Sequence, residues 1–170
     1  MDTFLAIASK RDWRKFSDRA IPEEVRTRIL DAGRLTGNAS NKQVWRFIVA
    51  DGEGTKQRLS ETVYAAGNVL NATFVVVIAA PAGELNAFDA GRAAQNMFLA
   101  AWNEGVASVP NGMPDPAATG EVVALEGDLK PHMVLSFGYP KREVGPESRS
   151  PEEWSAEANR KPLDEFVDRR

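Results

Sequence analysis

Residues 34–49 constrain the fold of this chain more than any other stretch, because three kinds of structure meet within them. A helical pattern ends near Leu35, a polar loop of small residues follows, and the chain then enters an apolar strand pattern through Trp45. Residues 10–16, earlier in the chain, form a basic turn. Clustered cations can hold an anion, and a loop of small polar residues can hydrogen-bond a planar polar ligand. The two segments together predict a site for a phosphorylated aromatic cofactor.

The amino-acid inventory leaves few side chains for direct catalysis. Its 170 residues correspond to one domain of ordinary size with room for a hydrophobic core. The absence of cysteine excludes disulfides, thiolate metal sites and cysteine nucleophiles. The single histidine, His132, disfavours a histidine metal cluster and a Ser-His-Asp triad, and we interpret it as structural. An enzyme with this inventory would take its chemistry from an organic cofactor.

Charge and hydropathy disfavour two further classes of protein. The net charge of -3 argues against a general role in nucleic-acid binding. The longest apolar run, at 74–81, is far too short to span a bilayer, and the N-terminus lacks the apolar segment and cleavage site of a signal peptide. We therefore expect a cytoplasmic protein without nucleic-acid or membrane partners.

Hydrophobic periodicity predicts mixed helices and strands along the chain. A first helix is expected from Asp2 to the basic turn, and the helix at 55–66 is expected to end at a cap formed by Gly67 and Asn68. The order of elements indicates an α+β fold or an α/β sandwich, and neither a dinucleotide-binding glycine turn nor a phosphate loop is present. The remaining helical patterns lie at 22–35, 89–104 and 116–125, and the strand patterns at 46–50, 73–80, 106–109 and 132–137.

The helix predicted at 89–104 is apolar on nearly every face. Such a helix is buried either in a core or at an oligomer interface, and the small size of the chain favours the interface. Residues 141–159 are charged and contain prolines, so we expect a surface excursion or an arm. Residues 160–167 regain alternation and predict an edge strand within a C-terminal extension at 160–170.

The ordered set of segments resembles the flavin-dependent nitroreductase family. This resemblance implies one domain over residues 1–170 with an α+β fold, a central, mostly antiparallel sheet flanked by helices, and an intertwined homodimer. It also implies FMN at the dimer interface and a ping-pong cycle, in which NAD(P)H passes hydride to flavin N5 and the flavin reduces a flat, electron-poor acceptor such as a nitroaromatic or a quinone. The matching segments cover nearly the whole chain and are residues 10–16, 21–24, 35–49, 93–101, 105–108, 138–140 and 160–167.

The resemblance also assigns cofactor contacts to individual residues. The basic turn and the C-terminal cations are expected at the FMN phosphate, the small-residue loop at the flavin ring, residues 109–112 near N5, and Asn68 near the pyrimidine side. Gln43 and Trp45 match a Gln-Pro-Trp signature that braces the loop. No side chain is assigned a catalytic role, and no metal is expected. The expected cofactor-binding residues are Lys10, Arg11, Asp12, Arg14, Asn38, Ala39, Ser40, Asn41, Gln43, Asn68, Val109, Pro110, Asn111, Gly112, Arg160 and Lys161.

Several positions depart from the family pattern and leave alternatives open. Asp12 stands where most members have serine, and its carboxylate must turn away from a phosphate or pair with Arg11 or Arg14. The segment that precedes residues 89–104 is too short for the helical cover of larger members. A non-catalytic flavin- or nucleotide-binding module and a flavin-dependent dehalogenase or flavin-modifying relative both remain as alternatives. A deazaflavin in place of FMN, and either NADH or NADPH as reductant, are equally compatible with the sequence.

Overall fold

The computed structural model describes residues 1–50, 52–142 and 145–170. These residues fall into two compact units, one of residues 11–142 and one of residues 1–10 with 145–170. The larger unit holds the sheet, and the smaller unit holds the two ends of the chain. The expectation that residues 1–170 make up a single domain stays a prediction.

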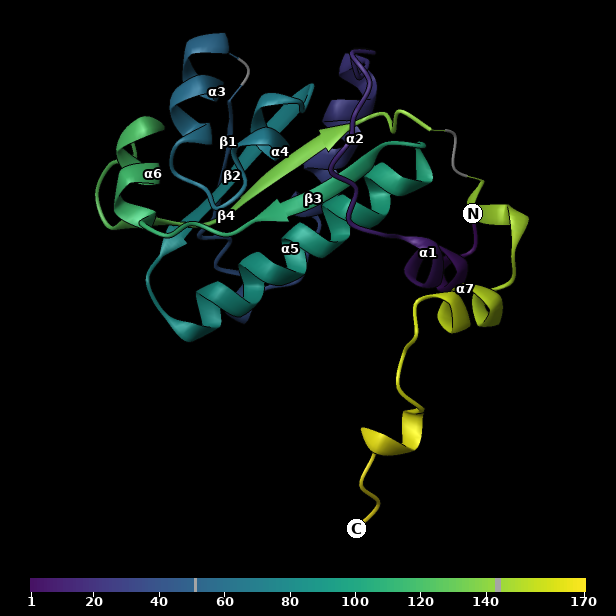
Figure 1. Ribbon diagram of the computed structural model, residues 1–170. Coiled ribbons are helices and arrows are strands. Elements are labelled where there is room, and N and C mark those ends of the chain that lie inside the picture. Colours follow the sequence, from purple (N-terminus) through teal and green to yellow (C-terminus); the bar gives the residue numbers. More distant parts are fainter. Residues whose placement is uncertain (51, 143–144) are drawn as a thin grey trace. The chain divides into compact units, whose positions relative to one another are not determined.

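A four-stranded antiparallel sheet forms the centre of the larger unit (Figure 1). The strands lie in the order β1-β2-β4-β3, and each neighbouring pair is antiparallel. The α+β class with an antiparallel sheet flanked by helices is therefore confirmed. The strands are β1 (Arg46–Val49), β2 (Phe74–Pro81), β3 (Ala107–Asn111) and β4 (Leu129–Gly138).

Helices cover both faces of this sheet, so β2 is buried on both sides, as its unbroken apolar run predicts. Phe74, Val76 and Ile78 belong to the core that β2 shares with α2 (Glu23–Arg34) and α5 (Glu84–Asn103). Val77 faces the other way because strand side chains alternate. On that second face, the sheet meets α4 (Ala66–Leu70), with α3 (Glu53–Ser60) and α6 (Pro116–Val122) beside it.

Helices α2 and α5 pack closely because a glycine lies at their contact. Val25 and Ile29 of α2 face the core, as the helical spacing predicts. A Cβ atom at Gly33 would lie 2.1 Å from Cε of Met97 and 3.0 Å from Cζ of Phe47. The absence of a side chain at position 33 therefore leaves the space that the end of the Met97 side chain fills.

Helix α5 is longer than predicted and is buried on one side only. It begins at Glu84 instead of Asp89, after Gly83 turns the chain out of β2 with a φ of 139°. Leu85 and Phe88 are 68% and 65% exposed on its outer side. These uncovered apolar side chains agree with a place at an oligomer interface, which stays a prediction. Within the described residues, no helix is long and apolar enough to cross a membrane.

The helix predicted at 55–66 ends early, because α3 stops at Ser60 and a separate helix, α4, begins only at Ala66. Helix α3 ends at Ser60 because the chain tightens there, with the N–H of Thr62 bonded to the Leu59 carbonyl three residues earlier. The predicted cap at Gly67 and Asn68 was wrong, since both residues lie inside α4. The side chain of Asn68 is buried there and so is available for contacts inside the protein.

The smaller unit contains short helices and no strand among its described residues. Asp2 caps α1 (Thr3–Ser9), as predicted, and Ser150 with Glu153 forms a capping box on α7 (Pro151–Glu157). The short turn η2 (Pro146–Ser148) precedes α7. The edge strand predicted at 160–167 was wrong, because a 3-10 turn, η3 (Leu163–Glu165), occupies this segment.

Candidate cofactor site

The loop between α2 and β1 has an unusual backbone conformation. It contains a 3-10 turn, η1 (Ala39–Asn41), and the φ angles of Ser40, Asn41 and Gln43 are 52°, 52° and 51°. A left-handed conformation costs a residue other than glycine about 1 kcal/mol or more. These three residues are exposed, so burial of their side chains contributes little against that cost. The polar contacts around the loop must therefore stabilise it.

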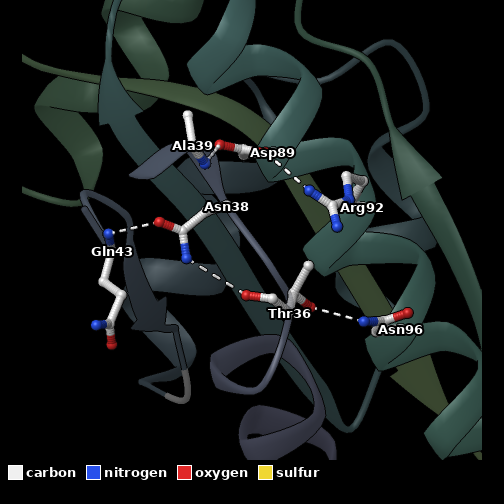
Figure 2. Close-up of polar contacts among 7 residues, drawn as sticks. All are labelled: Thr36, Asn38, Ala39, Gln43, Asp89, Arg92 and Asn96. Atoms are coloured by element: carbon white, nitrogen blue, oxygen red, sulfur yellow. Dashed lines mark hydrogen bonds and ion pairs between the residues drawn. The ribbon is translucent and has the colours of Figure 1, made fainter. Parts of the chain in front are cut away.

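Asn38 closes the loop with its side-chain amide (Figure 2). The N–H of Gln43 donates to Asn38 Oδ1 at 2.8 Å, and Asn38 Nδ2 donates to the Thr36 carbonyl at 3.4 Å. The side-chain Nε2 of Gln43 in turn donates to the Asn41 carbonyl at 3.3 Å. An asparagine suits this position because its short amide can satisfy nearby backbone groups on both sides.

Helix α5 holds the same loop through a buried carboxylate. The N–H of Ala39 donates to Asp89 Oδ2 at 2.9 Å, and Arg92 pairs with Asp89 Oδ1 at 3.2 Å (Figure 2). Asp89 is only 4% exposed. Further along α5, Asn96 Nδ2 donates to the Thr36 hydroxyl at 2.7 Å. We call this set the α5–loop cluster: Thr36, Asn38, Ala39, Gln43, Asp89, Arg92 and Asn96.

Two asparagines predicted from separate segments meet on the α4 side of the sheet. Asn68 Nδ2 donates to Asn111 Oδ1 at 2.9 Å. Asn111 Nδ2 donates to the Val134 carbonyl at 3.1 Å and to Ser136 Oγ at 2.9 Å. Both amides are buried, so these bonds replace water and hold the end of β3 in place.

Strand β3 extends to Asn111, two residues beyond the strand pattern predicted at 106–109. A proline is tolerated there because β3 is an edge strand and needs ladder bonds on one side only. Gly112 follows the strand and is exposed. Val109, Pro110, Asn111 and Gly112 therefore continue one rigid edge instead of forming a flexible loop.

The basic turn runs along the open edge of the same strand. Asp12 forms a parallel bridge with Ser108, and the N–H of Trp13 donates to the Ser108 carbonyl at 3.1 Å. Arg11 and Arg14 flank this bridge, and Arg14 is exposed. The structure thus brings the predicted phosphate-binding turn and the predicted N5 edge onto one strand, β3.

Three of the predicted cations belong to the smaller unit. Lys10 follows α1, where its N–H donates to the Ala6 carbonyl at 3.0 Å. Arg160 and Lys161 follow α7 and are exposed, and the ammonium of Lys161 pairs with Glu165 at 2.9 Å. That these cations join Arg11 and Arg14 around one phosphate stays a prediction.

Four members of the α5–loop cluster were not among the predicted site residues: Thr36, Asp89, Arg92 and Asn96. One signal was available. Asp89 is a carboxylate on the face of α5 that otherwise carries buried alanines and larger apolar residues. Trp45, which matches the Gln-Pro-Trp signature, lies in the core and is stacked on Phe47 with 6.1 Å between ring centroids.

The family of this chain follows from its match to a family model. Residues 7–80 and 60–139 match the model of the Nitroreductase family. The chain belongs to the nitroreductase family. A relative from Archaeoglobus fulgidus, provisionally named NADH dehydrogenase/NAD(P)H nitroreductase, is 30% identical over 148 residues, which are 81% of this chain and 84% of the relative.

Solved structures of nitroreductases have the same fold as this chain. A nitroreductase family protein from Clostridium difficile is similar with a TM-score of 0.82 and 25% identity, over 99% of this chain and 98% of that one. An FMN-dependent nitroreductase from another Clostridium difficile strain is similar with a TM-score of 0.77 and 24% identity, over 85% and 90% of the two chains. The antiparallel sheet and its flanking helices are therefore a nitroreductase fold.

Proposed function

We propose that this nitroreductase-family chain is an FMN-dependent oxidoreductase that transfers hydride from NAD(P)H to a flat, electron-poor acceptor such as a nitroaromatic or a quinone. The names of the relatives, an NAD(P)H nitroreductase and an FMN-dependent nitroreductase, favour this chemistry. The observation that carries the proposal is the loop at 38–43. Asp89 of α5 accepts a hydrogen bond from this loop, and Ser40 and Asn41 are exposed. Hydride transfer is the chemistry that bound FMN supplies.

The side chains around the site fit a phosphorylated flavin. A flavin ring presents carbonyl and nitrogen atoms along its edge, and a polar loop with exposed hydroxyl and amide groups can hydrogen-bond them. A phosphate requires several cations or an arginine fork. Arg11 and Arg14 supply such groups beside β3 in the larger unit. We assign the loop to the ring and the basic turn to the phosphate.

The end of β3 is held in place by hydrogen bonds from two neighbouring segments. The N–H of Tyr64 donates to the Gly112 carbonyl at 3.0 Å, and a Cβ atom at position 112 would lie 3.2 Å from Cδ2 of Tyr64. Because Gly112 has no side chain, the ring of Tyr64 can pack against its backbone. The buried amides of Asn68 and Asn111 hold this strand end rigid. We therefore assign residues 109–112 to the N5 edge of the flavin.

The proposed enzyme is a homodimer whose interface includes α5. Leu85 and Phe88 are the exposed apolar side chains that a second copy would cover. No side chain is required as a catalytic acid or base, because hydride moves directly and protons can come from water. The role of the chain is to bind and orient the cofactor and the acceptor.

The visible absorption spectrum of the purified protein, alone and with added FMN, tests the cofactor. We expect a flavin band close to one FMN per chain. Arg14→Ala and Arg160→Ala should each weaken FMN binding about tenfold, because each would remove a charge-assisted contact to the phosphate. Arg58→Ala removes an exposed arginine in the last turn of α3 and is the matched control, with wild-type affinity expected.

Turnover is tested by adding NADH or NADPH to the flavin-loaded protein without oxygen. An oxidoreductase loses its flavin band, which returns when a quinone or nitroaromatic is added. A band that persists would instead support a non-catalytic binding module. A colourless protein that does not take up FMN would contradict the proposed function as a whole.

A further inference from the structure

The carboxylate of Asp89 has a position that helix packing does not explain. Asp89 lies on the inward face of α5 together with Ala90 and Ala93, where the helix meets the core. Burial of a charge on such a face is unfavourable unless hydrogen bonds and an opposite charge compensate it. Both compensations are present, and they come from Ala39 and Arg92. The hydrogen bond of the Asp89 carboxylate is therefore made to the loop and not to the core.

Asp89 bonds the loop next to its strained backbone. Ala39, whose N–H it accepts, directly precedes Ser40 and Asn41 with their left-handed φ angles. The side-chain amide of Asn38 fixes the internal shape of the loop, but it does not connect the loop to a helix. The bond to Asp89 makes that connection, and a charge-assisted hydrogen bond is roughly twice as strong as a neutral one.

Arg92 completes the contact from the solvent side. Its guanidinium pairs with Asp89 and also covers Gly37, where a Cβ atom would lie 2.9 Å from Nη2. The same guanidinium lies 5.6 Å from the ring centroid of Phe88, which is exposed on the outer side of α5. The loop therefore rests on a charge pair at a defined position of α5, in which Asp89 is buried and Arg92 is exposed.

We propose that Asp89 is a positioning residue of the cofactor site, which fixes the loop at 38–43 to α5 so that Ser40 and Asn41 are presented to the flavin. This role rests on the proposed function, because it assigns the loop to the flavin ring. Asp89 is buried and acts through the Ala39 N–H without touching the cofactor. Loss of its carboxylate should loosen the loop and weaken FMN binding while the sheet stays intact.

The test compares Asp89→Ala, Asp89→Asn and Glu84→Gln by amide hydrogen exchange without FMN and by FMN titration. Asp89→Ala should speed exchange at the amides of residues 39–43 about tenfold and weaken FMN binding about tenfold. Trypsin should cut faster after Lys42, whereas the amides of β2 should keep wild-type exchange. Asp89→Asn keeps a hydrogen-bond acceptor, so its loop exchange and FMN affinity should lie between those of wild type and Asp89→Ala. Glu84→Gln removes an exposed carboxylate from the same helix and should match wild type.

Each contrary result overturns the proposal in a distinct way. Unchanged loop exchange in Asp89→Ala would show that the carboxylate does not hold the loop. Faster loop exchange with wild-type FMN affinity would remove the positioning role, and an equal increase at the β2 amides would reduce Asp89 to a general folding residue. A wild-type protein without FMN binding would overturn the proposed function and this role together. FMN binding that is equal in wild type and Asp89→Ala would overturn this role alone.

Discussion

Replacement of Gly138 by alanine is expected to lower the free energy of unfolding by about 2–3 kcal/mol, because the site has no room for a methyl group. Gly138 is the last residue of β4, and a Cβ atom there would lie 2.7 Å from both Cβ and Cγ of Phe16. These are atoms close to the Phe16 backbone, not the far end of a flexible side chain. Phe16 is also fully packed, at 1% exposure.

The segment that carries Phe16 cannot move away without losing other contacts. Phe16 forms an antiparallel bridge with Pro140, and the N–H of Ser17 donates to the Tyr139 carbonyl at 2.8 Å. Tyr139 and Pro140 are the two residues after Gly138. A shift of the Phe16 segment that relieves the clash would therefore strain the contacts of these two residues. The added methyl group therefore destabilises the fold instead of being absorbed.

Urea denaturation measures this effect, with Gly54→Ala as the matched control. Gly54 lies in α3, and a Cβ atom there would have no neighbour within 4 Å. Alanine at this position should therefore raise stability by up to about 1 kcal/mol through helix propensity. Equal stability of the Gly138→Ala protein and wild type would show that the segment at Phe16 relaxes freely.

Asn111→Asp is expected to lower the free energy of unfolding by about 3 kcal/mol at neutral pH, since it replaces a buried donor with an acceptor. Asn111 Nδ2 donates to the Val134 carbonyl and to Ser136 Oγ, and Oδ1 accepts from Asn68. A carboxylate of the same shape would place negative oxygen against the Val134 carbonyl. Asn111 is 3% exposed, so water cannot compensate.

The loss of stability in this variant should depend on pH in a predictable direction. Burial raises the pKa of the introduced carboxyl above about 3.9, its value in an unfolded chain. Between the pKa of the unfolded chain and the higher pKa of the folded protein, the folded state binds more protons than the unfolded state. The free energy of unfolding therefore falls as the pH rises through that window. Denaturation at several pH values measures this. Asn71→Asp, at an exposed residue after α4, should show little pH dependence, and an equally flat profile for Asn111→Asp would contradict the argument.

Hydrophobic periodicity predicted the elements whose apolar pattern reflects burial. The run at 73–80 identified β2, and the helical spacing at 22–35 identified α2, because burial on two faces or on one leaves a direct pattern in the sequence. The alternation at 160–167 was misleading. Residues 163–165 instead form η3, closed by the N–H of Glu165 on the Pro162 carbonyl. Alternation shows that a segment can be a strand, but pairing requires a second strand beside it.

Some residues of the candidate site were predicted from the sequence, whereas the contacts between them were not. The loop at 38–43 and the residues Asn68 and Asn111 were identified by resemblance to a family, whose segments keep their order in the sequence. The bond between the two asparagines was not foreseen, and Gly67 and Asn68 were predicted as a helix cap. Asp89 was placed at a helix start, although it lies inside α5. At a predicted helix start, the carboxylate of Asp89 did not stand out as a charge on a buried helix face.

The chemical inventory and the order of elements can be read from the amino-acid sequence, with no cysteine, one histidine, a basic turn and a polar loop before the first strand. Which of these groups meet depends on the packed fold. Ala39 and Asp89 are 50 residues apart in the chain, and Asn68 and Asn111 are 43 apart, yet each pair shares a hydrogen bond of 2.9 Å. Such bonds require the observed strand order and the packing of α2 against α5, and neither is recorded in a local sequence period.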